Sequence, residues 1–130
     1  MTTDLWMLVW SALLALVMPA VYLMGRAQTP GGLAWAFGNR EDPLEVPAWT
    51  GRAIRAHQNL VENLAPFAIL VLVAHVAGRA NATTALGASL FFWGRLAHAA
   101  VYTAGIRYLR TGVFFIAAAG ELVILVQLFG

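Results

Sequence analysis

The sequence contains no cysteine and no lysine, and few of its residues carry a charge. Without cysteine the chain forms neither a disulfide nor a thiolate of its own, so any thiol chemistry has to come from a bound ligand. Charged residues make up only 11% of the 130 residues, less than half of their usual share in soluble domains, whereas 61% are hydrophobic. The net charge is only +2 and the sequence has no run of basic residues, so it gives no sign of a nucleic-acid-binding surface. The composition therefore indicates an integral membrane protein.

Long apolar segments account for most of the chain. An apolar helix needs about 20 residues to cross a hydrocarbon core about 30 Å thick. The leader Met1-Thr2-Thr3-Asp4 lacks the basic residues of a secretory signal, so we expect the first helix to remain in the mature protein. We predict a single-domain all-α membrane protein, residues 1–130. Its four-transmembrane-helix bundle is expected at about residues 5–24, 51–77, 83–104 and 113–129.

Arginine is distributed unevenly between the two ends of these predicted helices. Glycines, prolines and charges between residues 26 and 50 predict an aqueous loop without a helix, and a compact loop with Arg107 and Arg110 lies on the same side. Only Arg79 falls in the turn on the opposite side. Because arginine-rich loops stay in the cytoplasm, we expect both termini outside, in a multi-pass protein of a bacterial inner membrane.

Two of the predicted helices carry a stripe of polar residues along one face. Offsets of 0, 3, 7 and 10 on the second helix, and of 0, 3 and 7 on the third, keep side chains on one side of an α-helix. These stripes hold more polar groups than helix locking requires, so we predict a ligand site along them. The stripe residues are Arg52, Arg55, Asn59 and Glu62, and Arg95, His98 and Tyr102.

Arg95 has two candidate acidic partners near the middle of the bilayer. A rise of about 1.5 Å per residue places Arg95 and Glu62 both about 15 Å from the loop side. A buried guanidinium needs a partner, and Glu62 is the first one that we consider. Glu121 on the fourth helix lies at a similar depth and competes for the same guanidinium. Both pairings remain open at this point.

The other polar side chains give no sign of a metal site. His57 and His98 have no second histidine or carboxylate at ligand spacing. His75 and Gln127 lie near the predicted outer helix ends, and we interpret them as packing or interface anchors without a chemical role. No metal is therefore expected.

The stripes also match motifs of a known family. Arg52-Ala-Ile-Arg55-Ala-His57-Gln-Asn59-Leu-Val-Glu62-Asn63, followed by Pro66-Phe67, resembles the second-helix signature of the membrane-associated proteins in eicosanoid and glutathione metabolism, the MAPEG family. Gly94-Arg95-Leu-Ala-His98-Ala-Ala-Val-Tyr102, with Leu109-Arg110-Thr111 before the last span, resembles that family's third helix and following loop. The resemblance covers essentially the whole chain and is of the microsomal glutathione transferase kind.

The resemblance implies a homotrimer that holds glutathione between subunits near the cytoplasmic face. Arg110 would stabilise the thiolate, because a cation beside a thiol lowers the pKa of that thiol. The residues that would bind the tripeptide are Arg55, Asn59 and Glu62 from one subunit and His98, Tyr102 and Arg110 from the next, with Arg52 and Arg95 as further candidates.

We therefore expect a glutathione-dependent transferase or peroxidase that acts on lipophilic electrophiles, with glutathione as co-substrate and membrane lipid around the trimer. The electrophile would reach the thiolate from the bilayer. The alternative is a non-catalytic lipid-binding or scaffold trimer of the same fold. A small transporter with Glu62, Arg95 and Glu121 as a relay is a third possibility, disfavoured because the helices form no paired repeats.

Overall fold

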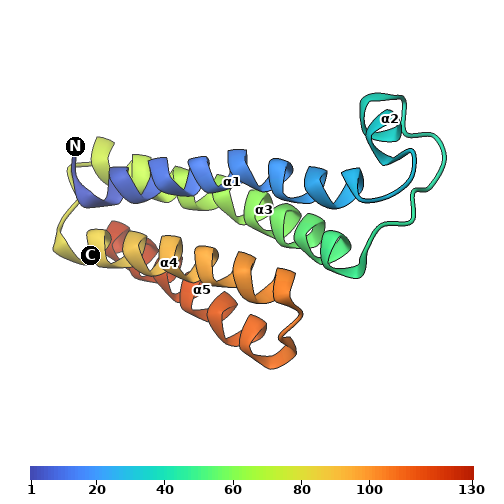
Figure 1. The fold of residues 1–130 in the computed structure, drawn as a ribbon. Helices are drawn as coiled ribbons and strands as arrows, with labels where there is room; N and C mark the ends of the chain where they lie inside the picture. Colours follow the sequence, from blue (N-terminus) through green and yellow to red (C-terminus); the bar gives the residue numbers. More distant parts are fainter.

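Four long helices and one short helix make up the chain, which a computed structural model describes over residues 1–130. Figure 1 shows the long helices running antiparallel, with both termini at one end and the α4–α5 turn and α2 at the other. This arrangement confirms the predicted all-α four-helix bundle. The elements are α1 (Thr3–Ala27), α2 (Gly32–Phe37), α3 (Ala48–Val76), α4 (Ala82–Ala104) and α5 (Arg107–Phe129).

Helices α1, α3 and α5 are long and apolar enough to cross a membrane, with mean hydropathies of 2.1, 1.6 and 2.2. The 23-residue α4 is less apolar than these three helices because it carries polar groups such as Arg95 and His98. Those two side chains are buried inside the bundle, whereas large apolar side chains such as Leu16 and Ile69 face outward. An inside-polar, outside-apolar helix bundle is the arrangement that a bilayer favours.

Small residues let α4 and α5 pack very closely. A Cβ atom added to Gly87 on α4 would lie 2.7 Å from the carbonyl oxygen of Gly120 on α5. A Cβ at Gly94 would lie 2.9 Å from the backbone nitrogen of Ala117. Contacts of this kind hold helices together in a bilayer, where apolar burial gives little driving force between them. The close packing of α4 against α5 therefore fixes the positions of the residues at the ends of these two helices.

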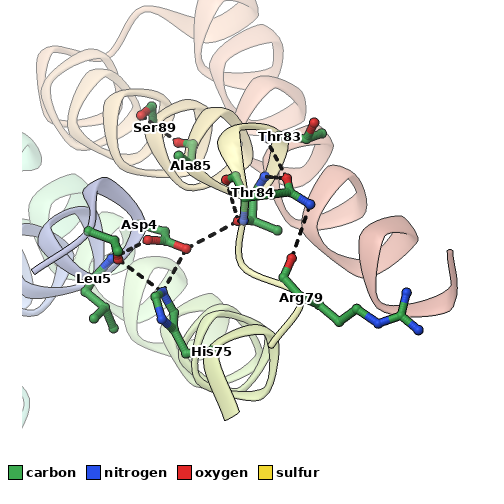
Figure 2. A network of polar contacts seen from close by, with 10 residues as sticks. Asp4, Leu5, His75, Arg79, Thr83, Thr84, Ala85 and Ser89 are labelled. Atoms are coloured by element: carbon green, nitrogen blue, oxygen red, sulfur yellow. Dashed lines mark hydrogen bonds and ion pairs between the residues drawn. The ribbon is translucent and has the colours of Figure 1, made fainter. Parts of the chain in front are cut away.

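A polar network joins the helix ends beside the termini (Figure 2). The buried Asp4 carboxylate on α1 lies 2.9 Å from His75 Nε2 on α3 and accepts a hydrogen bond from Thr84 Oγ1 on α4 at 3.3 Å. Asn81 caps α4 and donates to Gln127 Oε1 on α5 at 3.0 Å. The interpretation of His75 and Gln127 as packing or interface anchors did not include this network, because their partners are remote in the sequence.

The last helix begins earlier than the sequence analysis predicted. It starts at Arg107 rather than at Val113, so Arg107 and Arg110 belong to the first turn of α5 instead of a loop. Residues 107–111 contain neither proline nor glycine, and nothing in them stops a helix from extending toward α4. The two arginines are consequently held on a rigid element.

The segment predicted to be a loop without a helix also differs, because it contains α2. The helix follows Gly31, whose φ of 73° is a conformation that glycine adopts readily. The Arg26 guanidinium lies 4.9 Å from the ring centroid of Tyr22 and 5.2 Å from that of Trp35, which joins α2 to the end of α1. These cation–π contacts stabilise the short helix. Residue propensities alone do not predict them, because they depend on tertiary structure.

Candidate functional site

A polar pocket of about 300 Å³ lies where α3 and α5 begin and α4 ends. Four arginines and one tyrosine provide its side-chain polar groups, and no acidic residue lines it. Such a concentration of positive charge favours an anionic ligand. The lining residues are Arg52, Arg55, Tyr102, Gly105, Ile106, Arg107 and Arg110.

Tyr102 connects the two sides of this pocket. Arg55 Nε on α3 donates a hydrogen bond to the Tyr102 hydroxyl oxygen at 3.3 Å. The Arg110 guanidinium carbon on α5 lies 4.6 Å from the centroid of the Tyr102 ring, a cation–π distance. Because the hydroxyl oxygen accepts from Arg55, its own hydrogen remains available to a ligand. Tyr102 therefore presents a donor between two guanidinium groups.

Arg52 is held at the floor of the pocket by α4. Its Nε donates a hydrogen bond to the Thr103 carbonyl oxygen at 3.0 Å. Gly105 ends α4 with a φ of 84°, and a Cβ atom there would lie 3.1 Å from the Arg52 Cζ. Glycine suits this position because it adopts the left-handed conformation readily and, having no Cβ, leaves room for the guanidinium.

The N-terminus of α5 adds to the positive potential of the pocket. Ile106 precedes the helix without a side-chain cap, and the first turn contains no acidic residue. Backbone N–H groups and the helix dipole make such an end positive, so Arg107 and Arg110 in the same turn are locally unfavourable. A bound anion would relieve this repulsion.

Arg95 lies deeper in the bundle and pairs with Asn59, not with an acid. Its Nη1 donates to Asn59 Oδ1 at 2.6 Å, its side chain is 1% exposed, and its Nε and Nη2 have no partner. The expected Glu62–Arg95 pair is absent within the protomer, since Glu62 is exposed on the outer side of α3. Glu121 forms no ion pair with Arg95 either, although its Oε1 is buried.

His98 supports the pocket from behind. It is 3% exposed, and its ring packs edge-on against Tyr102 at 5.4 Å and, in a tilted arrangement, against Phe114 at 6.2 Å between centroids. The structure thus brings four of the predicted residues to the pocket wall, leaves three beneath it and one outside. The wall residues are Arg52, Arg55, Tyr102 and Arg110, the deeper ones are Asn59, Arg95 and His98, and the outer one is Glu62.

The comparison with protein families agrees with this architecture. A model of the MAPEG family matches residues 6–130, nearly the whole chain. The chain belongs to the MAPEG family. Together with the long apolar helices, membership makes it an integral multi-pass membrane protein. No curated protein sequence matches it. MAPEG proteins include glutathione transferases, peroxidases and non-catalytic members, so the activity of this one depends on its own pocket.

Sequence analysis did not assign Arg107 to the site, although it lines the pocket of this MAPEG protein. The available signal was its position three residues before Arg110, which places both on one helical face if the helix begins early enough. Because this segment was predicted to be a loop, helical spacing was not applied to Arg107 and Arg110. Gly105 and Ile106 were missed because they line the pocket mainly through the turn that they form.

Proposed function

We propose that this MAPEG protein binds glutathione in the arginine-lined pocket and uses it in transferase or peroxidase reactions on lipophilic electrophiles. The observation that carries the proposal is the convergence of four arginines and Tyr102 on one cavity of about 300 Å³ without an acid. Glutathione has two carboxylates, and guanidinium groups bind carboxylates through paired, charge-assisted hydrogen bonds. The volume lies at the lower end of the range for small-ligand sites, about 300 to 1,000 Å³.

Arg110 and Tyr102 are the proposed partners of the thiol. The guanidinium favours the thiolate over the neutral thiol, and the Tyr102 hydroxyl hydrogen, left over by its bond with Arg55, donates to the sulfur. In the transferase reaction the thiol proton leaves to solvent, and the thiolate attacks an electrophilic carbon. The new carbon–sulfur bond replaces the bond from that carbon to its leaving group, which departs as an anion such as chloride, and the product is a thioether. In the peroxidase reaction two glutathione molecules are oxidised to a disulfide while the peroxide is reduced to an alcohol and water.

Asn59 is the proposed donor at the inner end of the glutathione site. Its Oδ1 accepts from Arg95 at 2.6 Å, so the side-chain amide has a defined orientation and its Nδ2 remains free to donate. Asn59 is about one helical turn along α3 from Arg55, which suits two contacts with one extended tripeptide. Arg95 acts here as a positioning residue.

The proposed functional unit is a homotrimer in which a neighbouring protomer completes the glutathione site at the arginine-lined pocket, because Glu62 is exposed in the single chain and lies outside that pocket. It is the middle residue of α3, and a carboxylate facing lipid at that depth costs several kcal/mol. A neighbouring protomer and the α-ammonium of glutathione would cover it. The resemblance to the MAPEG second-helix motif supports this arrangement, because it implies that Glu62 binds glutathione.

The trimer prediction is tested by native mass spectrometry of the protein in nanodiscs. We expect a trimer, and Glu62→Gln should weaken glutathione binding about tenfold or more, since a hydrogen bond to a charged group contributes about 1.5 to 3 kcal/mol. Glu45→Gln, in the exposed loop before α3, is the matched control and should bind normally. Detection of monomers alone would contradict the trimer, and normal binding by Glu62→Gln would remove Glu62 from the site.

The function itself is tested with glutathione and a chlorodinitrobenzene electrophile. We expect bound glutathione to show thiolate absorbance near neutral pH in an ultraviolet difference spectrum, and the thioether to form at a rate proportional to bound thiolate. S-methylglutathione, which has no ionisable thiol, should bind without this absorbance. Binding without thiolate or turnover would instead assign the non-catalytic lipid-binding or scaffold function.

A further inference from the structure

The short helix α2 packs against α1 and against no other helix, and one of its faces is left uncovered. Figure 1 shows it beside the end of α1, away from α4 and α5. Gly32 and Ala36 form its buried face. Leu33 and Phe37, one turn apart on the opposite face, are 46% and 81% exposed, and Ala34 beside them is exposed as well. This outer face of α2 contains no polar side chain, which is typical of a surface that binds a partner.

The contacts that hold α2 in place come from its other side. The guanidinium carbons of Arg26 and Arg40 lie 5.2 and 5.7 Å from the centroid of the Trp35 ring. Trp35 Nε1 donates a hydrogen bond to the Asp42 carbonyl oxygen. Arg40 Nε and Nη2 both donate to the Ala36 carbonyl oxygen, at 3.0 and 2.8 Å. The outer face takes no part in these bonds, so it is free for a partner.

The position of α2 along α1 places it at the surface of the bilayer. The apolar part of α1 continues to Met24, and Arg26 is the first charged residue after it. The chain then turns back, because a Cβ atom at Gly32 would overlap the Arg26 carbonyl oxygen. Helix α2 therefore begins at the depth of Arg26 rather than farther out in water. Tryptophan and arginine at the end of a spanning helix are typical of the headgroup region.

We propose that the outer face of α2 inserts into the lipid headgroup region at this end of the bundle, with Leu33 and Phe37 directed toward the acyl chains. Val17 and Met24, seven residues apart on one face of α1, are 49% and 65% exposed, so an apolar lipid-facing surface reaches the end of α1 where α2 begins. The contact proposed between copies includes Glu62 on α3, a helix that α2 does not touch. Lipid is therefore favoured over a second copy as the partner.

The insertion should depend on apolar burial and not on the charge of the lipid. Arg26 and Arg40 lie next to α2, but three acidic residues between positions 41 and 45 offset them. A segment with this charge balance should enter zwitterionic and anionic membranes alike. Because Arg26 and Trp35 join α2 to α1, insertion of α2 would also fix the depth of α1 in the bilayer.

The absence of cysteine allows a single spin label to be placed at a chosen position for the test. In phosphatidylcholine nanodiscs we expect the label of Ala34→Cys, on the outer face, to be more accessible to oxygen, which concentrates in the bilayer, than to a water-soluble nickel chelate. Glu45→Cys, in the exposed loop before α3, is the matched control and should show the opposite order. Adding Phe37→Glu to Ala34→Cys should reverse the order, because a charge is unfavourable among acyl chains, whereas Phe37→Leu should preserve it.

Three results would overturn the proposal. Preference of the Ala34→Cys label for the nickel chelate would place α2 in water. Shielding from both reagents, with magnetic coupling between labels on different protomers, would make α2 a contact between copies. Preference for oxygen in phosphatidylglycerol nanodiscs alone would assign the contact to lipid charge instead of apolar insertion. The measurement needs no glutathione, so its failure is distinguished from failure of the proposed function.

Discussion

Replacing Arg110 with alanine is expected to raise the pKa of the bound glutathione thiol and to slow its reaction with an electrophile. The guanidinium contacts the Tyr102 ring at 4.6 Å and lies in the first turn of α5, whose dipole also favours the thiolate. Loss of one neighbouring cation raises such a pKa by about one unit or more, and each unit is about 1.4 kcal/mol of lost thiolate stabilisation. We therefore expect at least about a tenfold lower rate at neutral pH.

The measurement is an ultraviolet thiolate titration of bound glutathione, followed by rates with the test electrophile at several pH values. Glutathione binding should decrease less than the rate, because Arg55 and Arg107 remain on the pocket wall and can still bind carboxylates. The rate of Arg110→Ala should recover at high pH, where the thiol ionises without help. Arg107→Ala is the comparison variant, since Arg107 occupies the same helical turn without a contact to Tyr102. It should weaken glutathione binding but raise the pKa of the bound thiol less than Arg110→Ala does. If Arg110→Ala titrates like wild type, the thiolate role passes to Arg107 or Arg52.

The second large effect is expected in the middle of the bundle, from Asn59→Leu. Asn59 Oδ1 is the one hydrogen-bond acceptor of the Arg95 guanidinium, which is 1% exposed and already has two unpaired nitrogens. Removing one partner of a buried charge costs about 3 to 5 kcal/mol. Asn59→Leu should therefore strongly lower the thermal unfolding temperature in detergent.

A double-mutant cycle separates this mechanism from a simple loss of packing. Arg95→Met leaves no charge to satisfy, so Asn59→Leu combined with Arg95→Met should be more stable than Asn59→Leu alone. Asn63→Leu, one turn further along α3, is the control because its side chain bonds only to the Asn59 backbone carbonyl. Additive effects in the double variant would show that Asn59 and Arg95 are not energetically coupled.

Helix periodicity explains why Arg52 and Asn59 face the interior of the bundle, as predicted, whereas Glu62 of the same predicted stripe does not. At about 100° per residue, Arg52 and Asn59 lie nearly in line on α3, and Arg55 and Glu62 form a second line about 60° away. The first pair faces α4, where Arg52 contacts Thr103 and Asn59 contacts Arg95. The second pair is exposed in the single chain, and of the two only Arg55 reaches α4, through its hydrogen bond to Tyr102 at the pocket. The sequence contains both lines, but only packing selects which one faces inward.

The start of α5 shows a second limit of sequence reasoning. Residues 107–112 are compatible with either a loop or a helix, and intrinsic propensities differ too little to decide between them. The helical conformation of this segment is favoured by its contacts with the end of α4, which are the turn at Gly105 and the cation–π contact of Arg110 with Tyr102. The pocket that results has Arg107 on its wall, which no spacing argument about a loop could specify.

The sequence by itself determined the membrane class, the four long helices, the MAPEG family and the placement of most arginines at one end of the bundle. Each of these depends on composition, periodicity or a local motif, which are properties of neighbouring residues. Tertiary structure alone decided that Arg95 pairs with Asn59 and that Asp4 meets His75. These contacts join different helices, and the rotation of each helix about its axis depends on packing between helices, such as the close approach of small residues between α4 and α5.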